Sequence, residues 1–183
     1  PRGQTLESLP VPDLAEVTPA VLNISARPPR AEAGRLTTPI RLACGSIPLR
    51  RATIHLVYDA GWLNFDETDA DGDAVPDAVS ARLPSGARLA VSQERIGREG
   101  RLTLTIDAAS DSLLTGGIDI GVTLRQVGLP DEGAFGFGFD PKKPAELLDT
   151  HGRPVTPEIA GKGWRPGSFH AVYLPLLPRT SAR

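Results

Sequence analysis

The chain has 183 residues, a formal net charge of −2, 18 prolines, 19 glycines, one cysteine and no methionine. This length is sufficient for one sizeable hydrophobic core. The small net charge gives no general attraction to nucleic acid or anionic membranes, no apolar run approaches the roughly 18 residues needed to span a bilayer, and one cysteine cannot form an internal disulfide. Because methionine is absent, we expect a processed or excised piece of a longer product.

Residues 1–20 contain several prolines and no sustained hydrophobic period, so we expect a linker or a surface arm. Beyond them, apolar and polar residues alternate with the period of two that is typical of half-buried strands. The strands expected before the acidic stretch are residues 21–26, 36–44 and 51–58. Pro39 lies within the second of these and favours a sheet edge or a bulge there.

After the acidic stretch, alternating segments are separated by turns that contain glycine or proline. The strands expected here are residues 79–83, 87–94, 101–106, 117–125, 133–139, 155–159 and 169–174. In residues 133–139, GAFGFGF, phenylalanines share one face and glycines the other, which indicates that another group packs closely on the glycine side or that the strand bends. We expect a loop at 161–167 and a flexible tail at 176–183.

The pattern as a whole predicts an all-β protein. No long segment has a helical period, and turn signals recur about every 8–12 residues. We therefore expect one antiparallel β-sandwich, a jelly roll of about nine strands, over residues 21–175.

An acidic stretch is the sharpest chemical signal. Residues 66–77 hold six carboxylates, and no lysine or arginine occurs from residue 52 to residue 81. These carboxylates repel one another, and a hard cation would relieve the repulsion. Their spacing matches positions 1, 3, 5, 7 and 9 of a calcium loop, with the carbonyl oxygen at position 7. The predicted calcium ligands are Asp69, Asp71, Asp73, Val75 and Asp77.

Two departures weaken the predicted calcium site. Ala74 stands where position 6 calls for glycine, and Ser80 stands where position 12 calls for a bidentate glutamate. We therefore expect a dissociation constant on the order of 0.1–1 mM. The alternative is a solvated acidic turn that binds nothing specific.

Other chemistry finds little support in the sequence. The three histidines share no short metal-ligand spacing, and neither a nucleophile elbow nor a phosphate loop is present, so we identify no catalytic machinery. A pair of carboxylates across a cleft, as in a glycosidase, stays open, but the densest acids fit a metal loop better. Trp62, beside Leu63 and Phe65, is expected in the core. Trp164 lies in a glycine-rich segment and is expected to be exposed, where a sugar could stack on it.

Four stretches resemble cohesin-type domains, which are jelly-roll sandwiches of bacterial secreted and surface proteins. They are ATIHLVYDAGWLNF, GRLTLTIDAAS, LLTGGIDIGVTLRQV and LLDTHGRPVTP, and their order and spacing extend over residues 21–157. The resemblance implies a nine-stranded sandwich without enzymatic activity that binds a dockerin module, whereas related sandwiches bind carbohydrate. The acidic stretch, which is unusual for a cohesin, resembles the aspartate repeats of thrombospondin type 3 modules and, more distantly, dockerin and EF-hand loops. The segment from Lys162 onward is extra.

Three functional classes follow. The first is a non-catalytic protein-binding or adhesion module, calcium-stabilised, with a dockerin-like protein partner. The second is a carbohydrate-binding module associated with polysaccharide degradation, and the third is a structural spacer. We favour the first, as an extracellular or cell-surface monomer that uses a flat sheet face around GAFGFGF.

Overall fold

The computed structural model describes residues 18–109 and 112–166, in which strands are the regular elements and no α-helix occurs. The twelve strands are β1 (Val21–Ile24), β2 (Arg35–Ala43), β3 (Leu49–Asp59), β4 (Leu63–Phe65), β5 (Val79–Arg82), β6 (Arg88–Ile96), β7 (Glu99–Asp107), β8 (Gly117–Gln126), β9 (Phe137–Phe139), β10 (Glu146–Asp149), β11 (Pro154–Val155) and β12 (Glu158–Trp164). The all-β prediction is confirmed. The count exceeds nine because several strands are very short.

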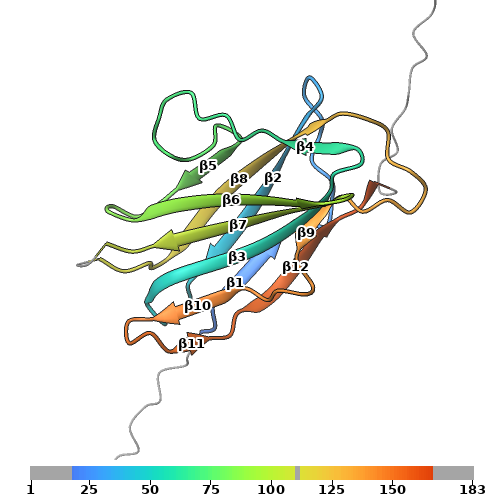
Figure 1. Cartoon of the computed structure of the whole chain (residues 1–183). Coiled ribbons are helices and arrows are strands. Elements are labelled where there is room, and N and C mark those ends of the chain that lie inside the picture. Colours follow the sequence, from blue (N-terminus) through green and yellow to red (C-terminus); the bar gives the residue numbers. More distant parts are fainter. Residues whose placement is uncertain (1–17, 110–111, 167–183) are drawn as a thin grey trace, which may run out of the picture.

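Two layers form the sandwich (Figure 1). In the front layer β6, β7 and β3 lie side by side, and the other edge of β3 pairs with β10 at one end and β9 at the other. The back layer runs β12–β1–β2–β8, with β4 and β5 both pairing with β8. The β9–β12 pair joins the layers on one side. All pairs are antiparallel except β1 with β12.

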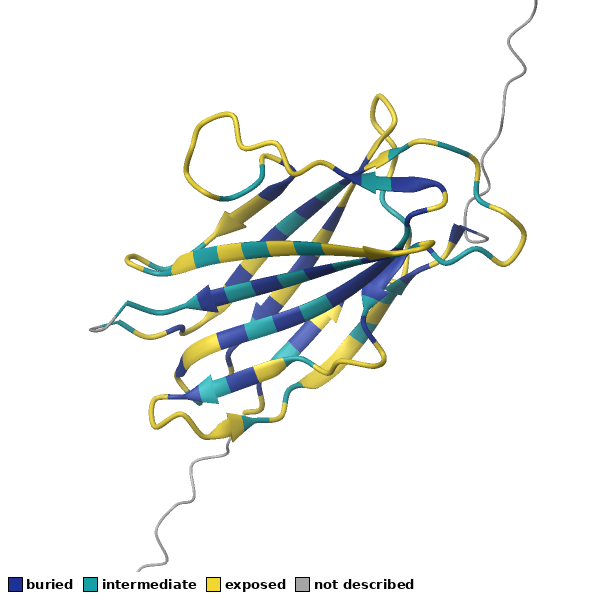
Figure 2. Ribbon diagram, in the orientation of Figure 1, coloured by how far each residue is buried: buried dark blue, intermediate teal, exposed yellow. Residues whose placement is uncertain are grey.

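Alternating burial along the long strands builds the core between the layers. In β2 and β7 every second side chain is buried, as the period-two pattern predicts (Figure 2). Leu102, Leu104 and Ile106 of β7 belong to the same buried cluster as Leu36 and Ile40 of β2. Burial of this apolar surface is the main favourable term in folding.

Two tryptophans pack together in this core. The Trp62 and Trp164 rings meet edge to face, with centroids 6.0 Å apart and an interplanar angle of 71°. Their indole N–H groups donate to the Phe135 carbonyl and the Thr38 hydroxyl, each at 3.0 Å. The core position predicted for Trp62 is confirmed. The exposure predicted for Trp164 is wrong, because β12 continues through most of the expected loop and carries this ring inward.

Trp164 also explains the glycines of GAFGFGF. A Cβ added at Gly136 would overlap the Trp164 ring, and one at Gly138 would overlap the Lys162 carbonyl oxygen. The close packing predicted on the glycine side is therefore confirmed. Only residues 137–139 of this segment form a strand.

Pro39 lies where one side of β2 is locally a sheet edge, as the sequence predicts. β2 pairs with β8 along its whole length, but β1 reaches only residues 40–43 of β2. At Pro39 the β1 side of β2 therefore has no strand partner among the described residues, and the missing N–H breaks no ladder there. The expected strand at 169–174, the tail at 176–183 and most of the N-terminal arm lie outside the described residues.

Candidate functional site

The outer surface of β6, β7, β3 and β10 is lined largely by small polar side chains, with a small polar hollow over His55 and Thr103. We call it the front face, and it faces the viewer in Figure 1. Register places Ala90, Thr105, Thr53 and Glu146 in one row across the four strands. The alternate residues are buried along much of β3 and β7 and partly buried in β6, so the front face consists of the outward half of each strand.

The next row of the front face runs from Ser92 through Thr103 to His55. His55 Nδ1 lies 3.1 Å from the Thr103 hydroxyl. Desolvation lowers the pKa of His55 and outweighs the opposing field of Glu146. The centre of the front face therefore carries an uncharged imidazole at neutral pH.

Charged pairs flank this small-residue centre at both ends. At one end Arg51 Nε lies 2.5 Å from an Asp107 carboxylate oxygen. At the other, Glu99 accepts from Arg101 and lies 3.4 Å from Lys142 Nζ. These exposed pairs add little to folding stability, but they can select a partner by charge.

The GAFGFGF segment does not form the expected surface. Phe137 is fully buried, and the neighbouring glycines lie against β12. The front face instead comes from the outward threonines of β7 and their neighbours on β3 and β6. The alternation LTLTI in the sequence was the available signal for it, because each outward residue in that run is a threonine.

The acidic stretch forms the loop between β4 and β5, and it brings three predicted calcium ligands together. Carboxylate oxygens of Asp69, Asp71 and Asp77 all lie within 4.8 Å of one another. Oxygens that share one calcium ion at 2.3–2.6 Å have separations of this size. Asp73 is not in this group, and its carboxylate accepts the Val75 N–H at 2.8 Å.

Backbone donors converge on Asp69, the first residue of the loop. Its carboxylate accepts from the N–H groups of Gly72 at 2.8 Å, Asp73 at 3.2 Å and Ala74 at 2.9 Å. Although desolvation opposes the shift, these donors lower the pKa of Asp69. The carboxylate therefore stays ionised at neutral pH.

Ala74 occupies a left-handed backbone conformation, with φ of 67°. This is the position where calcium loops use glycine, and the conformation is unfavourable for a residue with a Cβ. Ala74→Gly is therefore expected to raise the free energy of unfolding by about 0.5–1 kcal/mol, after allowing for the greater entropy of glycine in the unfolded chain. Urea unfolding of the two proteins measures the difference, and a lower stability of the glycine variant would contradict it.

No family model matches the sequence, and no curated protein matches it. The fold, in contrast, has clear counterparts among solved structures. One is the sixth cohesin of scaffoldin B from Acetivibrio cellulolyticus, in complex with a mutant Cel5 dockerin, with 14% identity, a TM-score of 0.54 and coverage of 81% of this chain and 99% of that one. This chain has the cohesin fold.

A second counterpart is the cohesin module of a family 33 glycoside hydrolase from Clostridium perfringens. It is 13% identical, with a TM-score of 0.51, and the match covers 79% of this chain and 98% of that one. The cohesin-like sandwich predicted from the four stretches is confirmed at the level of fold. Both matches cover nearly the whole solved module, so the described part of this chain corresponds to a complete cohesin sandwich.

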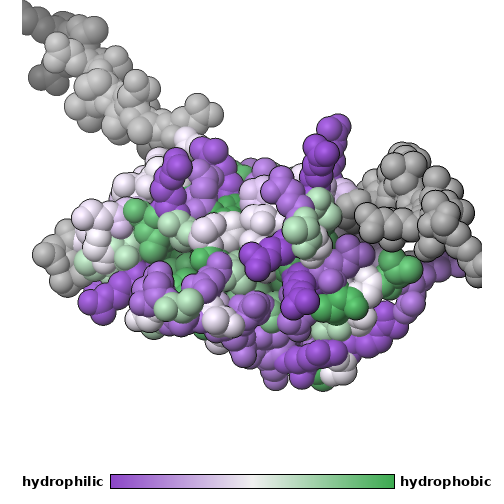
Figure 3. Space-filling view, turned by 90° about the horizontal axis from the view of Figure 1, so that it is seen from above, coloured by the Kyte–Doolittle hydropathy of each residue, from purple (hydrophilic) through white to green (hydrophobic). Residues whose placement is uncertain are grey.

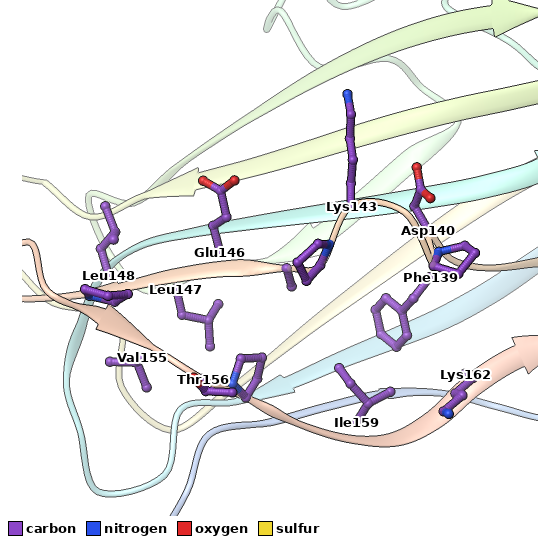
Figure 4. A pocket seen from close by; sticks show the side chains of 15 residues that line it. Phe139, Asp140, Lys143, Glu146, Leu147, Leu148, Val155, Thr156, Ile159 and Lys162 are labelled. Carbon is purple, nitrogen blue, oxygen red and sulfur yellow. The ribbon is translucent and has the colours of Figure 1, made fainter.

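An apolar opening lies at the side of this cohesin-like sandwich, where β10 of the front layer separates from β12 of the back layer (Figure 4). It has a volume of about 720 Å³. The side chains of Leu147 and Ile159 point into it from opposite strands, whereas Lys143 and Glu146 point away. Sites for small polar ligands need polar groups that converge on the ligand, so this opening does not suit a sugar.

Within residues 18–109 and 112–166, the acidic trio of Asp69, Asp71 and Asp77 is the one group of His, Cys, Asp or Glu side chains close enough to hold a metal ion.

The single cysteine, Cys44, is buried, and burial raises the pKa of its thiol. No helix in the described residues is long and apolar enough to cross a membrane.

Proposed function

We propose that this chain is a non-catalytic protein-binding module that recognises a dockerin-type partner through the front face. The cohesin fold carries the proposal, because a solved cohesin with the same fold is in complex with a dockerin. The chemistry of the front face supports it. The hollow over His55 and Thr103, about 210 Å³, is smaller than the roughly 300–1,000 Å³ of small-molecule sites. The threonines, serine and alanine around it can lie against another protein domain.

The proposal includes a role for the acidic loop and a place for the module. Calcium bound by Asp69, Asp71 and Asp77 would hold the long β4–β5 connection in one conformation, since it relieves repulsion among exposed carboxylates. Partner recognition of this kind belongs to a secreted or cell-surface bacterial protein. The carbohydrate-binding alternative has less support, because both tryptophans are buried and unavailable for stacking on a sugar.

Isothermal titration of the chain with a panel of dockerin modules tests the proposal. Thr103→Arg, in the centre of the front face, should weaken binding at least about ten-fold, because a long charged side chain prevents close approach. The matched control is Thr37→Arg on the outward surface of the back layer, which should bind normally.

Equal effects of the two arginine variants would contradict the assignment to the front face. Absence of binding across the panel would contradict the partner class. Retention of the chain in polysaccharide-containing gels, with no binding to any dockerin, would favour the carbohydrate alternative.

A further inference from the structure

β6 is a long sheet edge with one free side. All nine of its residues pair with β7, and among the described residues no strand pairs with its other side. Figure 3 views the molecule from above Figure 1, so it faces the side on which β6 and β5 end the two layers. Hydrophobic residues reach the surface there between hydrophilic ones. An exposed edge of this kind is a template for pairing with another strand.

The β6–β7 turn determines which backbone groups face the free side. Ile96 and Glu99 enclose the two-residue turn Gly97-Arg98, so they exchange both of their backbone hydrogen bonds. Bonding direction alternates along an antiparallel strand. The N–H and C=O groups of Leu89, Val91 and Gln93 therefore point away from β7 and towards solvent.

We propose that two copies of the chain pair antiparallel through β6, with Val91 of each copy opposite Val91 of the other on the two-fold axis. In this register Leu89 lies opposite Gln93 of the second copy. Leu89, Val91 and Gln93 then all form hydrogen-bonded pairs with the second copy. Leu89 and Val91, which are only partly buried against the core, gain cover from their counterparts.

Pairing of opposite charges favours this register over the registers centred on neighbouring residues of β6. With Val91 on the axis, Arg88 lies opposite Glu94 of the second copy, and symmetry repeats the pair. A shift that places Ala90 on the axis sets Ser92 opposite Arg88 of the second copy, so both attractions are lost. The opposite shift places Ser92 on the axis and sets Arg88 opposite Ile96, so both are lost again. Opposite charges directly across a strand pair are favourable, whereas like charges are not. The charged residues that would otherwise protect this edge thus become complementary.

The paired arrangement differs from the monomer expected from the sequence, and it does not depend on the proposed partner. Joining β6 to its counterpart would make the two front layers one continuous sheet. The front faces of the two copies would then lie next to each other on the same side of that sheet.

Sedimentation equilibrium of the full chain, at roughly 10 μM to 1 mM and without partner, tests the proposal. The mass should rise with concentration towards twice 19.4 kDa. Glu94→Arg should weaken association about ten-fold, because it sets two arginine pairs across the axis. The double variant Arg88→Glu/Glu94→Arg should restore it. Thermal melts show whether each variant is folded.

Cysteine trapping supplies an independent measurement. Residues in a hydrogen-bonded pair have Cα atoms about 5.5 Å apart, within disulfide range, so Val91→Cys should cross-link under oxidation. Ser92→Cys is the matched control, because in this register the two copies of residue 92 are diagonal neighbours about 7–8 Å apart. The native Cys44 is buried and should not react.

A monomer at every concentration would overturn the proposal, whether the edge is bare or covered by residues 167–183. A dimer that ignores the charge exchange, or one that cross-links through position 92 rather than 91, would also overturn it.

Discussion

Gly100→Ala is expected to lower the free energy of unfolding by about 3 kcal/mol, at the upper end of the usual cost of overpacking a core. Gly100 is a buried residue of β7 that pairs with Tyr58 of β3, and an added Cβ would overlap the Tyr58 ring. The ring cannot move easily, because it is 1% exposed and its hydroxyl accepts a hydrogen bond from Gln93. For a domain of this size the melting temperature should fall by about 6–12 °C.

Gly128→Ala is the matched control for Gly100→Ala. A Cβ at Gly128 would meet its nearest neighbour at 3.6 Å, which is ordinary van der Waals contact, and φ there is not in the left-handed region. The free energy of unfolding of this variant should lie within about 0.5 kcal/mol of that of the parent chain. If Gly100→Ala also has the same free energy of unfolding as the parent chain, the Tyr58 ring does not pack directly on Gly100 of β7.

Strands in which apolar and polar residues alternate strictly could be predicted from the sequence, because a sheet with one buried face imposes a period of two. Residues 117–125 and 101–106 were predicted nearly to their ends. β10 was not predicted, because its four residues are too short to show a period. Its place depends on pairing with β3, about a hundred residues earlier, which local pattern does not encode.

The candidate sites also differ in how far local sequence could predict them. Spacing within one loop grouped Asp69, Asp71 and Asp77, which do come close in the fold because a short chain limits how far they can separate. It also included Asp73, whose carboxylate accepts the Val75 N–H instead. The front face depends instead on the registers of β6, β7, β3 and β10, which bring distant residues into rows. The error at Trp164 has the same origin. Gly161 and Gly163 suggested an exposed loop around Trp164, whereas in the fold they let β12 lie close against β1 and β9.

Calcium at about 10 mM is expected to stabilise the chain by roughly 1.4–2.7 kcal/mol relative to the same protein in EDTA. This follows if the dissociation constant is about 0.1–1 mM and calcium binds only the folded state. The melting temperature should rise by about 3–10 °C. Magnesium should give a smaller rise, because it requires near-octahedral geometry at shorter distances and retains its water.

Single variants locate the calcium effect within the loop. Asp71→Asn should abolish most of the rise, since its carboxylate belongs to the trio of close oxygens. Glu67→Gln removes one charge from the same loop but no member of the trio, so it should keep the full calcium response. Asp73→Asn distinguishes the sequence-based ligand set from the trio. A large loss would mean that Asp73 turns from the Val75 N–H to the ion.

Equal melting temperatures in EDTA, calcium and magnesium would contradict the metal proposal but leave the proposed partner binding intact. The front face and the acidic loop come from different strands and loops, so neither requires the other. A loss of dockerin affinity in Asp71→Asn, measured at constant calcium, would show instead that the loop and the front face are coupled. In that case Asp71→Asn and Thr103→Arg should have non-additive effects on binding, which a double-mutant cycle measures directly.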